Sequence, residues 1–241
     1  MFSLRSVVKR YAAGGTEFRL TLPRLDIAAG SKLAFIGESG SGKSTLLELL
    51  AMILHPTEAT RFHFAPDPGG DSHDVAAAWQ ARDRDQLADF RRRHIGYVLQ
   101  HGGLLPYLTV RENINLSRRL LGRDTGEAAA RWADSLNIGA QLDKLPAALS
   151  VGQRQRVAVA RALAHEPAVL IADEPTAAVD PLNAARIMEL MVGLVDDLGV
   201  TLIVASHAHR LMENAGLELI DHSIASAGDN AMHVTVNHAV H

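Results

Sequence analysis

A glycine-rich loop at residues 37–45 constrains this chain most, because it stands between an apolar run and a strong helix former. The loop reads Gly-Glu-Ser-Gly-Ser-Gly-Lys-Ser-Thr and completes the phosphate-binding pattern G-x-x-x-x-G-K-[ST]. Its glycines let the backbone turn where a Cβ would clash, so successive N–H groups can converge on phosphate oxygens. The apolar run at 32–36 reads as a strand, and the segment at 46–51 reads as a helix whose N-terminus attracts anions. The sequence therefore predicts a nucleoside triphosphate site.

The loop residues have separate tasks at this predicted site. Lys43 supplies a mobile positive charge, and Ser44 supplies a hydroxyl that can bind Mg²⁺. The nucleotide-binding residues predicted from the loop are Gly37, Glu38, Ser39, Gly40, Ser41, Gly42, Lys43, Ser44 and Thr45. A chance Gly/Ser-rich turn would not be expected to lie between a strand and a helix in the order that phosphate binding requires.

Composition restricts the partners and the setting of the chain. With 241 residues and 47% hydrophobic content, the chain can bury a substantial core. The formal charge of −3 and the lack of a long basic run argue against a nucleic-acid partner. The absence of cysteine excludes disulfides and thiolate metal sites, and fits a reducing compartment such as the cytoplasm. No uncharged stretch approaches the roughly 20 apolar residues that a membrane-spanning helix needs.

The pattern along the chain predicts an α/β fold with a helical insertion. Two β-branched runs at 169–172 and 200–205 have the purity of buried parallel strands, and a helix at 182–198 separates them. The N-terminal part is strand-rich, 75–93 looks helical, and 109–164 is helical again. We therefore expect one domain over 1–241. Its P-loop NTPase core, with a mostly parallel sheet and an N-terminal antiparallel β-subdomain, comprises 1–97 and 166–241, and the α-helical subdomain is inserted at 98–165.

Two carboxylates follow the apolar run at 169–172, and parallel sheets bind ligands at the carboxyl ends of their strands. Asp173 can hold magnesium, usually through water, while Glu174 is placed to polarise an attacking water. Alternatively, both residues are ordinary solvated acids at the end of a strand. The phosphate loop on the same side of the predicted sheet favours nucleotide hydrolysis instead.

A second candidate anion site precedes the helical run at 154–163. The segment at 149–153 reads Leu-Ser-Val-Gly-Gln, and Ser150 is a good N-cap for a helix that can present free N–H groups to an anion. Here the chain resembles the ATP-binding cassette family, whose signature is Leu-Ser-Gly-Gly-Gln. The resemblance covers nearly the whole chain, with the motifs in the family's order. It implies that Ser150, Gly152 and Gln153 bind nucleotide.

The resemblance also implies roles for four single residues. Gln100 belongs to the loop that binds magnesium and assists catalysis, Asp180 to the D-loop, and His207 to the switch position. Tyr11 is similar to the aromatic residue that stacks on adenine. Each has a simpler reading: Gln100 as a polar loop residue, His207 as a strand-end histidine with His209 as a competitor, and Tyr11 as a packing residue.

Val151 departs from the family pattern, because it replaces the first signature glycine. A valine keeps the backbone N–H and can adopt a helical φ, so the segment can still function. The branched side chain could slow closure of the site or select a partner.

The resemblance implies a site shared between two subunits. In the family, two cassettes face each other head to tail, so each ATP lies between the phosphate loop of one chain and the signature segment of the other. Glu174, aligned by Asp180 and His207, would direct water onto the γ-phosphate. Lys43, Mg²⁺ and the opposing Ser150 would stabilise the developing charge.

Without a membrane-spanning segment, the work of ATP must pass to another chain. The segment at 100–114 is unusually apolar for a loop, and in the family this region receives a transmembrane permease subunit. Alternatively, Leu104, Leu105 and Leu108 only pack against the helical insertion. Packing and contact with a permease are compatible with each other. The chain would then lie on the inner face of the cell membrane through its permease.

The amino-acid sequence of this loop is most similar to that of stand-alone cassettes from lipoprotein-release, macrolide-export and cell-division complexes. The leading hypothesis is an ATPase subunit that energises an exporter or extractor. The alternative is a cassette that transmits force or signal to a membrane complex without moving a solute. Soluble cassettes of DNA repair or translation do not fit a chain of 241 residues. His233, His238 and His241 lack the spacing of a known metal site, and no function is read from the tail after Ser223.

Overall fold

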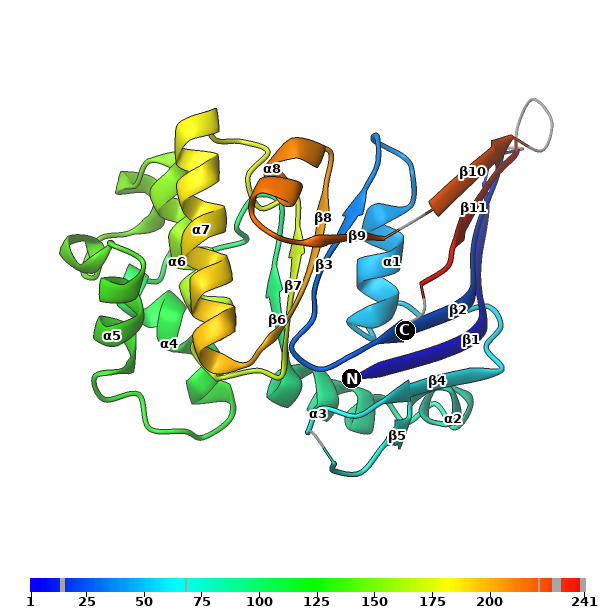
Figure 1. Cartoon of the computed structure of the whole chain (residues 1–241). Helices are drawn as coiled ribbons and strands as arrows, with labels where there is room; N and C mark the ends of the chain where they lie inside the picture. Colours follow the sequence, from blue (N-terminus) through cyan, green and yellow to red (C-terminus); the bar gives the residue numbers. More distant parts are fainter. Residues whose placement is uncertain (14–15, 68, 221, 227–230, 239–241) are drawn as a thin grey trace.

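Two β-sheets and a layer of helices build the protein (Figure 1). The computed structural model describes residues 1–241 except 14–15, 68, 221, 227–230 and 239–241. The central sheet has five parallel strands in the order β6-β7-β8-β3-β9. Their bounds are β3 Lys32–Ile36, β6 Ile95–Val98, β7 Val169–Asp173, β8 Thr201–Ser206 and β9 Glu218–Ile220. This sheet and its helices confirm the predicted α/β fold.

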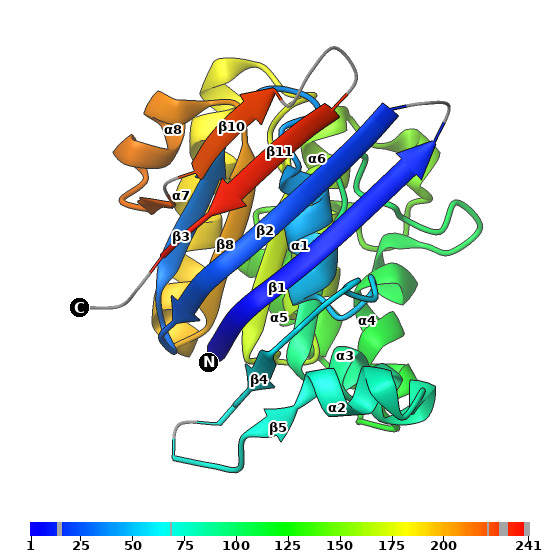
Figure 2. The ribbon, with the colours of Figure 1, turned by 90° about the vertical axis from the view of Figure 1, so that its right-hand side faces the viewer.

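The second sheet is formed mostly by the N-terminal part of the chain. Its order is β10-β11-β2-β1-β4-β5, with β1 and β2 paired as a long antiparallel hairpin. The bounds are β1 Phe2–Ala13, β2 Thr16–Ile27, β4 Arg61–Phe64, β5 His73–Asp74, β10 His222–Ser226 and β11 Ala231–Val236. The C-terminal segment, from which the sequence predicted no function, supplies β10 and β11, and β11 runs parallel to β2 (Figure 2).

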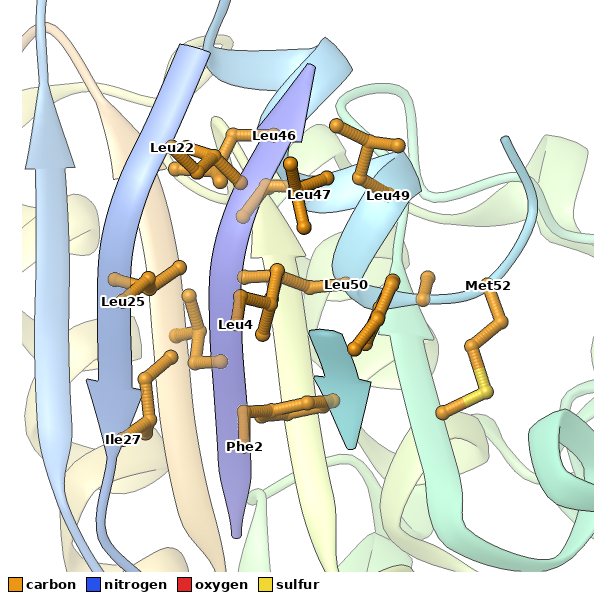
Figure 3. Packing of buried hydrophobic residues seen from close by; sticks show 14 of the residues in the cluster. Phe2, Leu4, Leu22, Leu25, Ile27, Leu46, Leu47, Leu49, Leu50 and Met52 are labelled. Carbon is orange, nitrogen blue, oxygen red and sulfur yellow. The ribbon is translucent and has the colours of Figure 1, made fainter. Parts of the chain in front are cut away.

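Helix α1 (Lys43–Leu50) lies between the two sheets and follows directly from the phosphate loop (Figure 1). Leu46, Leu47, Leu49 and Leu50 are all fully buried. Figure 3 shows these leucines against side chains of the β1–β2 hairpin, in one hydrophobic cluster that also contains residues of the parallel sheet. At about 25 cal/mol per Å² of apolar surface, this burial fixes α1 and therefore the loop that precedes it.

The opposite face of the parallel sheet is covered by a layer of helices. Successive residues of β7 point to the two faces, so Leu170 and Ala172 pack on these helices while Val169 and Ile171 face α1. The helices on this side are α4 Val110–Leu120, α5 Ala128–Ser135, α6 Val151–Leu163 and α7 Pro181–Leu198, with short turns at Gly139–Gln141 and Pro146–Ala148. The boundaries at 97 and 166 between a core and a helical subdomain stay an interpretation.

One helical prediction needs correction. The segment predicted to be helical over 75–93 forms two helices, α2 (Val75–Gln80) and α3 (Arg84–His94). The chain breaks at Arg82, whose φ is 56°, and Asp83 then caps α3 by accepting a hydrogen bond from the N–H of Gln86 (2.9 Å). The last helix is α8, His209–Asn214. No helix in the described part of the chain is both long and apolar enough to cross a membrane.

Candidate nucleotide site

The phosphate loop has the shape that its glycines predict. Gly42 is the N-cap of α1 with φ 86°, in the left-handed region that favours glycine. A Cβ at Gly37 would lie 2.3 Å from Oγ of Ser41 and 3.0 Å from its Cβ, so a side chain there would have to displace Ser41. The loop therefore presents backbone to a ligand at the N-terminus of α1.

Lys43 is buried at the base of this loop. Its Nζ donates hydrogen bonds to the carbonyls of Gly37 (2.6 Å) and Glu38 (2.9 Å), and it lies 3.3 Å from Oε1 of Glu174. Lys43 is 7% exposed and Glu174 is 9% exposed, so the pair is largely shielded from water. Positive charge is thus held in place beside the loop, opposite a carboxylate from another strand end.

Glu174 follows β7 in a left-handed conformation, with φ 46°. Its N–H donates to the carbonyl of Ala205 on β8 (2.9 Å), which fixes this backbone against the neighbouring strand. Its Oε2 lies 2.9 Å from Nδ1 of His207 and accepts a longer bond from the His207 N–H (3.4 Å). The competitor His209 is directed to Glu213 instead (3.1 Å). The structure thus brings Glu174, Lys43 and His207 together.

A cavity of about 350 Å³ opens over the loop. Ser44, Gln100 and Asp173, the three predicted magnesium ligands, come from different segments and all line it. Hydroxyl, amide and carboxylate oxygens suit this hard cation, so these residues fit a Mg²⁺ held with phosphate oxygens. The full lining is Tyr11, Phe18, Ser39, Gly40, Gly42, Lys43, Ser44, Thr45, Gln100, Asp173 and Glu174.

Two aromatic residues form one wall of the cavity. Tyr11 on β1 and Phe18 on β2 are partners in the hairpin register, with ring centroids 6.1 Å apart. Nζ of Lys9 lies 5.0 Å from the centre of the Tyr11 ring. Phe18 was not predicted as a site residue. Phe18 could be recognised as a site residue only from its position opposite Tyr11, which requires the register of the hairpin.

The second candidate anion site, at residues 149–153, lies elsewhere on the chain. Ser150 caps α6, because its Oγ accepts from the N–H of Gln153 (3.2 Å) while Oε1 of Gln153 accepts from the N–H of Ser150 (2.9 Å). Val151 is the first residue of α6 and is 41% exposed. A Cβ at Gly152 would have only Val179 within 4 Å, at 3.7 Å, so packing within this chain does not require a glycine there.

Asp180 lies beside this signature segment (149–153) and caps α7. Its Oδ1 accepts from the N–H of Asn183 (3.1 Å), its Oδ2 accepts from Nδ2 of Asn183 (2.7 Å), and these bonds lower the pKa of Asp180. Ser150, Gly152, Gln153 and Asp180 line a separate cavity of about 430 Å³. Among the described residues, this cavity and the one over the phosphate loop share no lining residue. Within one chain, the structure does not bring the two predicted halves of the site together.

The described residues contain no group of three His, Cys, Asp or Glu side chains that could hold a metal ion. His241 lies outside the described residues.

Comparison with known proteins agrees with this geometry. The family model described as ABC transporter matches residues 20–177. The lipoprotein-releasing system ATP-binding protein LolD of Alcanivorax borkumensis is 40% identical, over 84% of this chain and 86% of that protein. The macrolide export ATP-binding/permease protein MacB of Rhodopirellula baltica is 38% identical, over 86% of this chain, which spans only 30% of that protein.

A solved structure is similar over almost the whole chain. It is the dimeric, post-hydrolysis state of an ATP-binding cassette bound to ADP and Pi, with a TM-score of 0.79 and 32% sequence identity. The match covers 91% of this chain and 93% of that one.

Proposed function

This chain belongs to the ABC transporter family of ATPases, and we propose that it energises a membrane export or extraction complex. In this proposal, ATP draws the chain and a second ATPase subunit into a closed dimer, and hydrolysis reopens it. The observation that carries the proposal is the separation of the two cavities. One cavity is lined by residues of the phosphate loop and by Glu174, and the other by residues of the signature segment and by Asp180. The two cavities lie apart on one chain.

A head-to-tail pair of chains would join these halves. The phosphate loop of one subunit would face the start of α6 of the other, where the N–H groups of Val151 and Gly152 carry the positive end of the helix dipole. The glycine at 152 supports this arrangement, because the chain's own packing leaves room for a side chain that the sequence does not use. The dimeric relative bound to ADP and Pi is consistent with such a pair.

Hydrolysis would use groups that the structure holds next to each other. Glu174 lines the cavity, and its carboxylate would orient the attacking water and accept its proton. His207 fixes one oxygen of that carboxylate, so the other remains available beside Lys43. Ser44, Gln100 and Asp173 would hold Mg²⁺, which when bound neutralises charge on the phosphate oxygens.

The membrane partner would contact the loop that connects β6 to α4, named the Gln100 loop here (residues 99–109). Leu99 is 49% exposed and Tyr107 is 72% exposed, so the loop offers apolar surface to a second protein. Leu104 packs against the helical core, and packing of this residue leaves the exposed Leu99 and Tyr107 for the proposed contact. Through this contact the chain would lie on the inner face of the cell membrane.

The substitution Glu174→Gln tests the proposal. We expect the variant to bind ATP and to accumulate as a dimer, while its turnover falls by about 100-fold or more, which is the usual loss when a general base is removed. Light scattering during size-exclusion chromatography measures the dimer, and phosphate release measures the turnover. Glu127→Gln, an exposed glutamate at the start of α5, serves as the matched control and should behave like the parent. Normal turnover in Glu174→Gln would contradict the assignment of the base.

A further inference from the structure

One side chain of α6 is bonded to the backbone of the Gln100 loop. Arg161 donates from Nη1 to the carbonyl of Gly103 (2.7 Å) and from Nη2 to the carbonyl of Gly102 (2.8 Å). Two donors of one planar guanidinium on consecutive carbonyls fix the orientation of the loop as well as its position. Burial lowers the pKa of Arg161 from its usual value, but an arginine stays charged at neutral pH.

The part of the loop that Arg161 binds is a tight turn directly after Gln100. Gly102 has φ 72° and Gly103 has φ 59°, both in the left-handed region that favours glycine. The N–H of Gly102 donates to the carbonyl of Leu99 (2.8 Å), and a Cβ at Gly103 would lie 2.6 Å from Cδ1 of Leu99. Because the hydrogen bond from the Gly102 N–H to the Leu99 carbonyl closes the turn around Gln100, a shift of Gln100 would move the carbonyls that Arg161 binds.

The far end of the loop is bonded to α4. Asn113 is fully buried, and its Nδ2 donates to the carbonyls of Leu105 (3.1 Å), Leu108 (3.0 Å) and Thr109 (3.0 Å). Its Oδ1 accepts from the N–H of Leu105 (2.9 Å). Helices α4 and α6 share one hydrophobic cluster. The loop from residue 102 onward is therefore bonded to the helical layer at both ends, while Gln100 lines the cavity over the phosphate loop.

We propose that Arg161 is a positioning residue. It transmits a change in the position of Gln100 to the signature segment at the start of α6, and this inference rests on the proposed function. Arg161 lies on α6, whose first residues Val151 to Gln153 belong to the signature segment and whose N-cap is Ser150, so a displacement of this helix moves both ends together. A nucleotide held by the phosphate loop would thus set where the same chain presents Ser150 to its partner. Arg161 couples the two half-sites of one chain.

The test separates ATP binding from ATP-driven dimerisation, in the Glu174→Gln background. Arg161→Ala should leave the dissociation constant for a fluorescent ATP analogue within about threefold of the background value. The ATP concentration that half-saturates dimerisation should rise by at least about fivefold, the lower end of typical coupling between sites. Arg161→Lys keeps the charge but loses the two-pronged bond, so its dimerisation should fall between the background and Arg161→Ala. If Arg161→Ala does not fold, the ATP dependence of dimerisation in Arg161→Lys tests the proposal instead.

Arg118 on α4 provides a matched control, because it also binds backbone near the C-terminal end of α6. Its guanidinium also binds backbone, from Nη1 to the carbonyl of Ala164 (3.0 Å) and from Nε to the carbonyl of Asp124 (2.7 Å), but it makes no hydrogen bond to the Gln100 loop. Arg118→Ala should lower the melting temperature without shifting the ATP dependence of dimerisation. The inference is overturned if Arg161→Ala and Arg161→Lys dimerise like the background, or if Arg118→Ala shifts dimerisation equally. Failure of Glu174→Gln itself to dimerise would instead overturn the proposed function.

Discussion

Glu174 has a backbone conformation that residues with a side chain adopt at a cost of about 1–3 kcal/mol. The bond from its N–H to Ala205 and the contact of its carboxylate with His207 offset that cost. The left-handed turn also directs the carboxylate toward Lys43. Strain at a single residue is therefore used to place the group that we assign to water activation.

Tyr11 and Phe18 yield a prediction about the base of the nucleotide. Stacking of a base on an aromatic ring contributes about 1–3 kcal/mol, so Tyr11→Ala and Phe18→Ala should each weaken ATP binding about fivefold or more. Binding of inorganic triphosphate, which has no base, should be unchanged in both variants. Isothermal titration with the two ligands measures this difference. Equal losses for both ligands would mean that the rings only support the fold of the loop.

Residues of the phosphate loop could be predicted from the sequence because consecutive positions fix their geometry. Gln100 and His207 depended on the family resemblance, and the structure places both beside the predicted groups. Phe18 could not be predicted because its place is set by pairing between strands. Asp180 was expected to align Glu174, but its carboxylate is bonded to Asn183 in this chain. The role predicted for Asp180 in aligning Glu174 therefore stays a prediction.

Among the elements, the β1–β2 hairpin is fastened near its open end by Asp26. Arg5 on β1 donates to Oδ1 (2.7 Å) and Oδ2 (2.9 Å) of Asp26, and Arg24 and Ser3 add further bonds. Burial raises the pKa of Asp26, but the bonds from Arg5, Arg24 and Ser3 outweigh burial and lower the pKa to about 2. The charged carboxylate is thus favoured by the folded state.

This ion pair makes the stability of the hairpin depend on pH. Because the pKa is lower in the folded state, the stabilisation is complete above the unfolded pKa near 4 and is lost as pH falls toward 2. Asp26→Asn should lower the free energy of unfolding by about 1 kcal/mol at pH 7, because water screens the charges of the partly exposed Arg5 and Arg24. The loss should be clearly smaller at pH 3. Denaturant unfolding at both pH values measures it, with the exposed Asp71→Asn as the control. A deficit that is equal at both pH values would rule out the charge as its cause.

Helices and strands differed in how well they could be predicted from their local sequence. The strands β7 and β8 were predicted because a buried parallel strand is apolar along its whole length. The strands β10 and β11 were not predicted, because they complete a sheet begun by residues at the other end of the chain. The break between α2 and α3 was missed because it depends on one residue with a left-handed φ and the cap that follows.

For the whole molecule, the predicted ABC fold and family are confirmed, while the pairing of chains governs the activity that we propose. Val151 would lie where the two subunits meet, at the exposed start of α6. In the Glu174→Gln background, Val151→Gly should lower the ATP concentration needed for dimerisation, because it removes a branched side chain next to the partner's nucleotide. Binding of ATP by the monomer should not change. Weaker dimerisation in the glycine variant would show that the valine side chain contributes to the contact.

The position of β11 beside β2 also affects the order in which the chain can fold. Val234 is fully buried, and a Cβ at Gly42 would lie 3.8 Å from its Cγ2, so the tail packs behind the phosphate loop. On the ribosome, residues 37–45 are synthesised long before residues 231–236 exist. Contacts between parts so distant in the sequence form late, because the loop between them must first close. A growing chain can therefore contain the whole phosphate-binding motif and still lack the strand that supports it.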